Sequence, residues 1–414
     1  MPMRNRYAGR PFTTSTADIA AALEQVSIPT LLLSLVHITG DPRYIRDFRQ
    51  AGLFLNEIQG FMSDEDRSRA RAAALDVLTD YRDRGCPEPA PLSPALINEM
   101  LDWAACEPVP EQYLPMLAEE LDLAGADPRR PDPVDPAGAA DCPVVVIGCG
   151  QSGLLAGIRL KQAGIPFTIV EKNPGPGGTW WENSYPGSRV DVANHFYCYS
   201  FEPNNAWTHY FAEQPELQSY FATLLAKHDL DGHVLWGTEV TAAAWDDDAG
   251  EWAVSLRDGA GATSTVRARG LISAVGQLNR PHIPEFAGAD TFAGPSFHSA
   301  AWDHSVDLAG KRVALIGAGA SGFQIGPAIA DRVARLTVFQ RSAQWMFPNP
   351  MYHDRVGDGV GWAMDHLPFY GRWYRFLLMW PGADKGLDAA RVDPDYPDQG
   401  YAVSEMNALG RLMF

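Results

Sequence analysis

The chain has 414 residues, of which 46% are hydrophobic and 20% are charged, the composition of a globular protein with two or three domains. Its 51 acidic and 33 basic side chains give a formal net charge of −18, which argues against a nucleic-acid partner or an anionic membrane surface. The five cysteines show no CxxC spacing, so we expect reduced thiols, no metal site and a cytoplasmic location.

Residues 1–123 are expected to form a helical N-terminal extension. Ser15 or Thr16 can cap a helix in which Ile19, Leu23 and Val26 recur at helical spacing. The stretch IPTLLLSLVHI that follows is too short to span a bilayer. Residues 63–84 again place acids in the first turn and basic residues near the end. We see no catalytic pattern here and interpret the extension as a packing module, through which a homodimer would form.

Residues 124–143 read AGADPRRPDPVDPAGAADCP, a linker rich in proline, aspartate and glycine. Such a composition is expected to form neither a helix nor a central strand, so the linker marks a domain boundary. Strand-like and helix-like stretches then alternate up to about residue 345. This alternation predicts a doubly wound α/β fold.

A first glycine fingerprint follows the linker. The apolar stretch 144–147 leads into Gly148-x-Gly150-x-x-Gly153 and an amphipathic helix, and a second strand, FTIV, ends at Glu171, 23 residues after Gly148. The glycines allow a pyrophosphate to approach the start of the helix. A carboxylate after the second strand can accept from ribose hydroxyls and repels a 2′-phosphate. We therefore predict an FAD or NAD site and not an NADP site.

A second fingerprint, Gly317-x-Gly319-x-x-Gly322, has the same strand and helix around it but a different ending. The residue 24 positions beyond Gly317 is Arg341, followed by Ser342. A guanidinium there can pair with the 2′-phosphate of NADP. One chain thus carries an FAD-like and an NADPH-like site, and hydride transfer from nicotinamide to flavin is the natural inference.

These patterns predict an α/β fold with two Rossmann-like dinucleotide-binding domains behind an N-terminal α-helical extension. Residues 144–290 would be the first part of the FAD-binding domain, and residues 291–350 the start of the NADP-binding domain. Residues 351–414 begin with many aromatics at helical spacing. We interpret them as a helical insertion in preference to a membrane-touching helix.

The spacing of the cysteines limits which classes of flavin-dependent enzyme the chain can belong to. Disulfide reductases with two dinucleotide sites need a redox-active cysteine pair, and Cys149 inside the first fingerprint has no partner at usable spacing. The remaining broad class is a monooxygenase, in which reduced flavin reacts with O₂.

Two longer stretches resemble the signatures of type I Baeyer–Villiger monooxygenases. FAGPSFHSAAWD matches the pattern Fx-G-xxx-H-xxx-W-(P/D) through Phe292, Gly294, His298, Trp302 and Asp303. GGTWWENSYPGSRVD, residues 177–191, is similar to the second signature. DVANHFYCYSFEP, the N-terminal extension and VGWAMDHLPFYGRWYRF look most like the 4-hydroxyacetophenone monooxygenase subgroup.

The resemblance implies an NADPH- and FAD-dependent enzyme that inserts one oxygen of O₂ beside a ketone carbonyl, through a flavin C4a-peroxide, giving an ester or lactone. The substrate would be a small-molecule ketone, and the subgroup suggests an aromatic one. The residues it assigns to FAD are Gly148, Gly150, Ser152, Gly153, Glu171, Gly178, Thr179, Trp180, Asp191, Tyr197 and Val240. Those it assigns to NADPH are Gly317, Ala318, Gly319, Ala320, Ser321, Gly322, Gln324, Arg341 and Ser342.

Two roles in the resemblance go beyond cofactor contact. His298 and Trp302 would couple the motion of the two nucleotide domains, and Asp191 would act in catalysis by pairing with an active-site arginine. The family carries that arginine in a Lys-Arg pair, followed by the last FAD strands, and we find no counterpart of either. Arg391 and Arg411 stand outside such a pair, and we assign the role to neither.

The resemblance therefore describes a C-terminally truncated member of the family, and two alternatives stay open. The chain could be a non-catalytic fragment that binds FAD and NADP. It could also be a flavin monooxygenase that oxidises nitrogen or sulfur, although Trp302 and the GGTW…YPG…Asp191 stretch argue against this.

Overall fold

The computed structural model describes residues 4–53, 57–342, 344, 349–383, 391–397 and 404–405. The chain divides into two compact units. The helical unit comprises Met1–Arg129, Asp191–Phe211 and Met346–Phe414. The α/β unit comprises Arg130–Val190 and Ala212–Trp345. Each unit combines segments that are distant in sequence.

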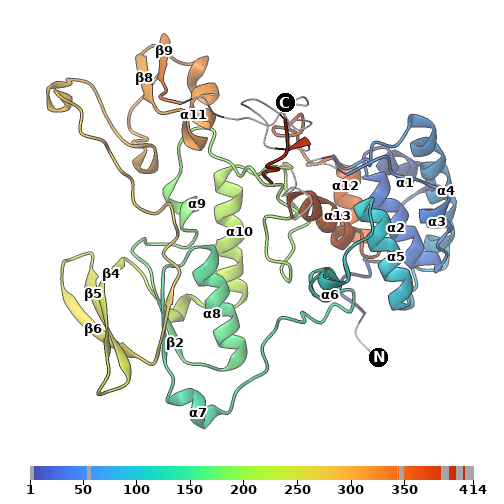
Figure 1. Cartoon of the computed structure of the whole chain (residues 1–414), viewed down its shortest axis with the longest axis horizontal. Helices are drawn as coiled ribbons and strands as arrows, with labels where there is room; N and C mark the ends of the chain where they lie inside the picture. Colours follow the sequence, from blue (N-terminus) through green and yellow to red (C-terminus); the bar gives the residue numbers. More distant parts are fainter. Residues whose placement is uncertain are drawn as a thin grey trace. The chain divides into compact units, whose positions relative to one another are not determined.

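Within the described residues, the helical unit is built from eight α-helices (Figure 1), and four of them begin after a serine. Ser15, Ser27, Ser63 and Ser93 each accept a hydrogen bond from a backbone N–H of the first turn, as N-caps do. The helices expected near Thr16 and Asp64 are therefore present. The α-helices of the unit are α1 (Thr16–Leu23), α2 (Ile28–Thr39), α3 (Arg43–Arg46), α4 (Asp64–Asp83), α5 (Pro94–Ala105), α6 (Leu114–Leu121), α12 (Asp358–His366) and α13 (Tyr370–Met379).

The N-terminal helices and the helices after residue 358 share one hydrophobic core. Every residue of α2 from Ile28 to His37 is buried, and Trp373 of α13 donates from its indole nitrogen to His37 Nε2 at 2.9 Å. Burial lowers the pKa of His37 to about 3, so this ring is a neutral acceptor. Within the residues that the structure describes, no helix is both long enough and apolar enough to cross a bilayer.

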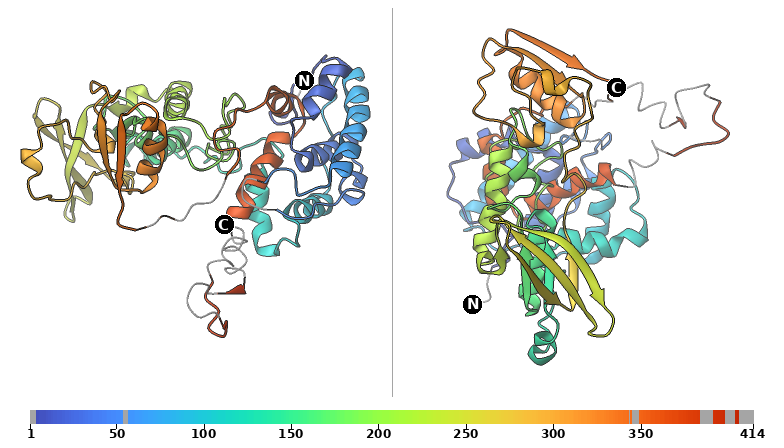
Figure 2. Two further views of the ribbon diagram at one scale, coloured as in Figure 1. Left: turned by 90° about the horizontal axis from the view of Figure 1, so that it is seen from above. Right: turned by 90° about the vertical axis from the view of Figure 1, so that its left-hand side faces the viewer.

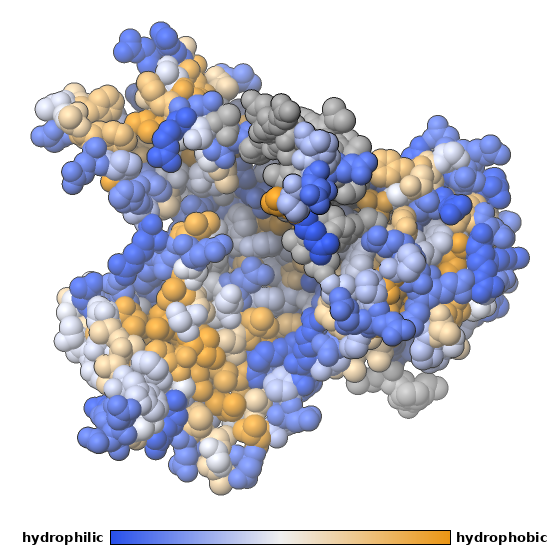
Figure 3. Space-filling model, in the orientation of Figure 1, coloured by the Kyte–Doolittle hydropathy of each residue, from blue (hydrophilic) through white to orange (hydrophobic). Residues whose placement is uncertain are grey.

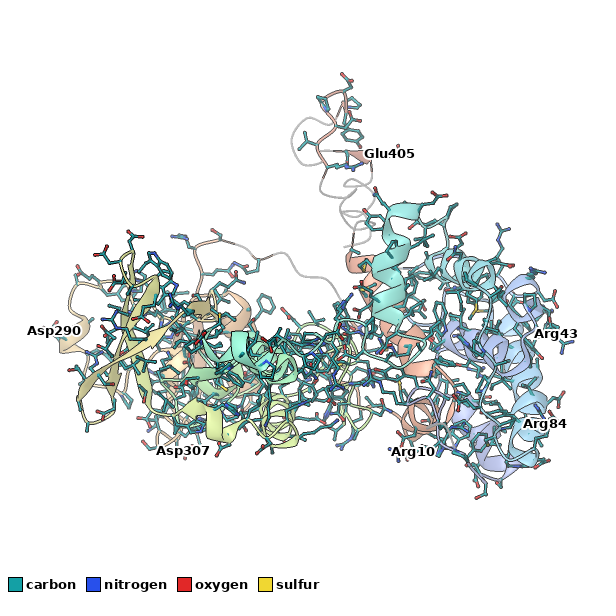
Figure 4. The ribbon with its side chains drawn as sticks, turned by 90° about the horizontal axis from the view of Figure 1, so that it is seen from below. Arg10, Arg43, Arg84, Asp290, Asp307 and Glu405 are labelled. Atoms are coloured by element: carbon teal, nitrogen blue, oxygen red, sulfur yellow. The ribbon has the colours of Figure 1, made fainter. Side chains whose placement is uncertain are left out.

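Charged side chains cover the outside of the helical unit. Arg43 and Arg84 point away from it (Figure 4). Arg84 pairs with Asp80 at 2.8 Å and Arg43 with Asp41 at 3.2 Å, with all four side chains well exposed. Exposed pairs of this kind contribute little to stability, so the apolar core holds the unit together.

The α/β unit is centred on a parallel sheet of four strands in the order β3-β2-β1-β7. Because β1 lies between β2 and β7, the connections leave it in opposite directions, and such a switch point opens a crevice at the carboxyl end of the strands. The strands are β1 (Val144–Ile147), β2 (Phe167–Val170), β3 (Val234–Leu235) and β7 (Gly270–Ser273), with helices α8 (Gln151–Ala163), α9 (Thr179–Glu182) and α10 (Gln214–Lys227).

An antiparallel meander, β4 (Thr238–Asp246), β5 (Glu251–Asp258) and β6 (Thr263–Ala268), follows β3 and precedes β7 (Figure 2). Its inward side chains Val254 and Leu256 pack on Val145 and Val170 of the parallel sheet. On the face seen in Figure 3, hydrophobic residues gather in the part of the α/β unit around β2 and the meander.

A second parallel pair completes the described α/β unit. Strands β8 (Arg312–Ile316) and β9 (Arg335–Phe339) run beside helix α11 (Ala320–Ala330). Ile325 and Ile329 of α11 are buried, whereas Ile316 is 64% and Phe339 is 55% exposed. One face of this pair is therefore packed and the other is open to solvent.

The linker at 124–143 contains a helix that the sequence reading did not expect. Helix α7 (Pro136–Ala140) begins after Asp135, whose side chain accepts from the Gly138 N–H at 3.4 Å. Pro136 is compatible with a helix here because it occupies the first turn, where its missing N–H is not needed. The expectation of no helix in the linker was wrong for these five residues.

Candidate functional site

The first glycine turn joins β1 to α8. Different physical constraints favour glycine at its three glycine positions. Gly148 has φ +100°, and a Cβ there would lie 2.7 Å from the Ala274 carbonyl oxygen. A Cβ on Gly153 would lie 1.8 Å from the Gly148 oxygen. Gly150 has an ordinary φ of −77°, and its Cβ would make an ordinary contact of 3.4 Å with Gly178. The fold thus requires the first and third glycines, whereas the second leaves room for a close ligand.

Glu171, directly after β2, lies beside this turn. Its carboxylate accepts from the Cys149 N–H at 2.6 Å and from the Asn173 N–H at 2.8 Å, and the residue is 4% exposed. Burial, with Glu171 and Asp231 adding to it, raises the pKa of the Cys149 thiol to about 12. Cys149 is therefore protonated at neutral pH, and all five cysteines are free. The raised pKa does not fit a redox-active thiol.

The GGTW signature packs on the back of the first turn. The Gly177 N–H donates to the Cys149 carbonyl oxygen at 3.2 Å, and α9 begins at Thr179. Trp180 is buried, whereas Ser152 and Thr179 are exposed. The signature therefore fixes one side of the turn and leaves two hydroxyl groups available.

The YPG stretch that follows contacts the second nucleotide helix, α11. Gln324 of α11 accepts from the Tyr185 hydroxyl at 3.0 Å, and its amide nitrogen donates to the Arg189 carbonyl at 2.8 Å. Gly187 has φ +81°, and a Cβ there would lie 2.6 Å from the Gln324 backbone oxygen. The Gln324 side chain, expected on NADPH, thus faces the YPG stretch.

The FAGPSFHSAAWD signature also reaches α11. Trp302 packs against a hydrophobic cluster that Tyr185 of the YPG stretch forms with Ile325 and Ile329 of the second nucleotide helix. His298 Nδ1 accepts from the Ala300 N–H at 3.1 Å, which starts a short 3-10 turn. Trp302 is thus the residue of the signature that packs against this cluster.

The remaining residues of this signature act locally. The Asp303 carboxylate accepts from the Ser305 N–H at 2.9 Å and from its hydroxyl at 2.6 Å. These bonds lower the pKa of Asp303. Phe292 is 64% exposed, and its ring occupies the space that a Cβ on Gly294 would need. Asp303, Phe292 and Gly294 therefore shape the loop itself.

The second glycine turn, between β8 and α11, repeats the backbone pattern of the first. Gly317 has φ +103°, and a Cβ on Gly322 would lie 2.4 Å from the Gly317 oxygen. Gly319 has φ −75°, and its Cβ would meet no described atom within 4 Å. Neither strain nor packing explains a glycine at 319, but the close approach of a pyrophosphate does. Around it lie Ala318, Ala320 and Ser321, which the sequence also assigned to NADPH.

Arg341 and Ser342 follow the end of β9 and are exposed. The strand end is tied to the turn, because the Gly317 N–H donates to the Phe339 carbonyl at 2.8 Å. Arg341 makes no ion pair with any residue that the structure describes. Its guanidinium is thus available to an anionic ligand.

Three further residues that the resemblance assigns to FAD belong to other segments of the chain. Asp191 and Tyr197 belong to the helical unit, in segment 191–211. Asp191 is exposed and makes no ion pair within the described part of the chain. Val240 lies in β4 and packs beside the Val145 and Val254 cluster.

Sequence reasoning missed the role of Arg189, which is 9% exposed. Its guanidinium pairs with Glu213 at 2.7 Å, and its carbonyl holds Gln324. The signal in the sequence was a charged residue two positions after the YPG motif, which is too common to be informative.

Comparison with known proteins agrees with this geometry. Residues 142–366 match the model of the flavin-binding monooxygenase-like family. An uncharacterized monooxygenase, y4iD of Sinorhizobium fredii, is 35% identical over 94% of this chain and 58% of its own length. A Baeyer-Villiger monooxygenase of Pseudomonas aeruginosa is 44% identical over 52% of this chain and 40% of its own.

Among solved structures, a cyclohexanone monooxygenase from Rhodococcus sp. Phi1 bound to NADP+ is 38% identical over 50% of this chain and 39% of its own, with a TM-score of 0.47. The chain spans about half the length of the curated relatives named above. With two glycine turns in place and the family model matched over residues 142–366, the chain belongs to the flavin-binding monooxygenase-like family.

Proposed function

We propose that the chain binds FAD at the first glycine turn and NADPH at the second, and that it serves an NADPH-dependent Baeyer–Villiger monooxygenase. Such an enzyme inserts one oxygen atom of O₂ beside a ketone carbonyl and yields an ester or lactone. The observation that carries the proposal is the opposite charge after the two strands. A buried carboxylate, Glu171, lies at one turn, and an unpaired guanidinium, Arg341, follows the strand at the other.

FAD fits the first turn. Gly150 leaves space for a pyrophosphate, and the Glu171 carboxylate keeps acceptor capacity, because two of its roughly four lone-pair positions are taken by N–H groups. The remaining lone pairs of the carboxylate would accept hydrogen bonds from the ribose hydroxyls of FAD. Ser152 and Thr179 would add hydroxyl donors at the rim. FAD, when bound, supplies a hydride acceptor and the reaction with O₂.

NADPH fits the second turn by the same reasoning. Gly319 opens the turn to a pyrophosphate at the N-terminus of α11. Arg341 would pair with the 2′-phosphate, with the Ser342 hydroxyl beside it. A carboxylate at that position would repel the phosphate, and for this reason we assign NADP to the second turn and not to the first.

Between the turns, Trp302, Tyr185 and Gln324 would keep the two nucleotides in a fixed relation. Two hydrogen bonds and an apolar contact join α11 to the YPG stretch. His298 would support Trp302 by shaping the turn that precedes it. This is the coupling role that the signature predicts.

Asp191 would act as the catalytic carboxylate, exposed and ready to pair with an arginine. We assign that arginine to neither Arg391 nor Arg411, and Arg411 lies outside the described residues. An aromatic ketone substrate, the 4-hydroxyacetophenone monooxygenase subgroup, a homodimer through residues 1–123 and a cytoplasmic location remain predictions. The domain limits at 144–290, 291–350 and 351–414 are proposed on the same basis.

The test is product analysis with the purified chain, FAD, NADPH and O₂. The ketone would be 4-hydroxyacetophenone, and an aryl methyl thioether would be offered separately. We expect an ester from the ketone, lost in the Asp191→Ala variant. A sulfoxide without any ester would identify a sulfur-oxidising enzyme. Flavin reduction by NADPH without either product would indicate a fragment that binds both nucleotides and does not oxygenate.

A further inference from the structure

Segment 191–211 contains no helix or strand. Its two ends lie close together. A hydrogen bond joins these ends, from the Asn194 N–H to the Tyr210 carbonyl at 2.9 Å. Backbone carbonyls in an irregular buried segment still need donors. In residues 195–201, side chains of α13 and of the first residues of the chain supply them.

Arg375 of α13 supplies several of these donors. Its Nη1 donates to the carbonyls of Phe196 at 2.7 Å, of Cys198 at 3.1 Å and of His195 at 3.4 Å. The guanidinium also lies over the Phe196 ring at 4.8 Å. One side chain thus holds both sides of Tyr197.

Arg372, one turn earlier, extends the anchor. It donates to the Ser200 carbonyl at 2.6 Å and to the Leu121 carbonyl at 2.7 Å. The N-terminal residues add two more bonds, from Tyr7 Oη to the Ser200 carbonyl at 3.4 Å and from Arg6 to the Phe201 carbonyl at 3.3 Å. The N-terminal extension therefore holds this segment directly.

The charge of Arg375 is compensated by the N-terminal extension. Its Nε donates to Glu120 of α6 at 2.6 Å, and the two side chains are 10% and 11% exposed. Burial raises the pKa of Glu120, but Arg375 and Arg129 outweigh it, so the net shift is downward. His195 lies in the same region, and burial lowers its pKa to about 4, so it adds no competing charge at neutral pH.

A buried ion pair is weak evidence for stability alone, because an apolar pair of the same size would serve as well. An apolar side chain at position 375 could not satisfy three carbonyls of an irregular segment. The arginine therefore determines the path of residues 195–198. Asp191 precedes His195 by four residues, and Tyr197 follows it by two. The backbone path of residues 195–198 therefore sets where these two residues lie.

We propose that Arg375, held by Glu120, is a positioning residue for the Asp191–Tyr197 stretch, and that the N-terminal extension contributes to the flavin site in this way. The inference rests on the proposed function, because only that function places Asp191 and Tyr197 at FAD. It gives residues 1–123 a role beyond packing.

The experiment compares the full-length wild type with Arg375→Met, Arg375→Lys and Glu120→Gln. Arg84→Met is the matched control, because Arg84 is an exposed arginine in the same unit. Hydrogen exchange of peptides covering 191–211 is measured without cofactor, and FAD affinity and the visible flavin spectrum are measured separately. Should Arg375→Met fail to fold, Arg375→Lys keeps the charge but removes the planar guanidinium, which serves Glu120 through Nε and the three carbonyls through Nη1.

We expect exchange in 191–211 to rise at least about tenfold in Arg375→Met, with α2 peptides unchanged, and less in Glu120→Gln. FAD affinity should fall about tenfold with a shifted flavin spectrum, and Arg84→Met should match wild type. Unchanged exchange in 191–211 would overturn the anchor. Faster exchange with unchanged FAD affinity and spectrum would overturn its role at the flavin. A wild type that binds no FAD would refute the proposed function itself, while the exchange data would still decide the anchor.

Discussion

The two glycine turns share one backbone design and differ in what surrounds them. Gly148 and Gly317 have φ of +100° and +103°, and Gly153 and Gly322 have no room for a Cβ. The middle glycines differ, because Gly150 approaches Gly178 while Gly319 meets no described atom. The first turn is enclosed by Glu171 and the GGTW signature, and the second is exposed beside Arg341.

The two turns show that the glycine motif involves two separate properties, the shape of the turn and its preference for one nucleotide. The glycine spacing fixes the shape of the turn, which is the same for both nucleotides. We propose that the residue after the second strand and the segment packed on the turn set the nucleotide that each turn prefers. A lone fingerprint therefore shows that a dinucleotide can bind but does not show which one.

The largest expected effect distinguishes two alanine variants. One replaces a glycine that the packing of the turn requires, and the other replaces a glycine that only the bound nucleotide requires. Gly153→Ala should lower the free energy of unfolding by about 3 kcal/mol or more, because its Cβ would overlap the Gly148 oxygen. Gly319→Ala should leave unfolding unchanged and weaken NADPH binding about tenfold. Denaturant unfolding and NADPH titration measure both. Equal destabilisation by the two variants would contradict the distinction.

The charge at the second turn should decide which nicotinamide nucleotide is used. Arg341→Gln should weaken NADPH binding by about 10- to 100-fold, the range of a charged hydrogen bond, and leave NADH nearly unchanged. Arg335→Gln, at the other end of β9, is the matched control. Parallel losses for NADPH and NADH in Arg341→Gln would show that the guanidinium does not contact the 2′-phosphate.

At the first turn, the carboxylate supports both the fold and the ligand. Glu171→Gln should lower the free energy of unfolding by about 1–2 kcal/mol, because the charged acceptor of the Cys149 N–H is lost. FAD affinity should fall by about tenfold as well. Calorimetry of FAD binding and denaturant unfolding measure the two effects. A normal FAD affinity would remove Glu171 from the ribose site.

The smallest effect concerns Cys149, whose pKa rises from an ordinary 9.0 to about 12 through burial, Glu171 and Asp231. Between these values the folded chain retains a proton that the unfolded chain loses, so stability falls as pH rises above 9. The loss should be about 1 kcal/mol at pH 10 and absent in Cys149→Ser. Unfolding at pH 8 and pH 10 measures it. A flat profile in the wild type would show an unperturbed thiol.

Local features were readable from the sequence because they depend on neighbours in the chain. Strand 144–147, both glycine turns, the cap at Ser15 and the helix within 63–84 lie where the sequence predicted them. Helix α7 was missed because proline content was given more weight than the cap at Asp135. The coupling role that the family signature implies for His298 and Trp302 stays a prediction, although Trp302 does pack against the cluster of Tyr185 and α11.

Features that depend on tertiary contacts were not readable. No spacing rule places Gln324 against Arg189, 135 residues away. The buried arginines of α13 looked like ordinary polar positions on an aromatic helix, because their acceptors are backbone carbonyls and carry no sequence signal. The same reason hid the link between Glu120 and segment 191–211.

The central claim is that the two turns bind different nucleotides, and an anaerobic titration tests it most directly. The purified chain would be loaded with FAD, and the visible flavin absorption followed while NADPH or NADH is added. We predict that NADPH bleaches the flavin and that NADH does so far less, with the preference lost in Arg341→Gln. A chain that takes up no FAD, or a flavin reduced equally by both nucleotides, would contradict the assignment.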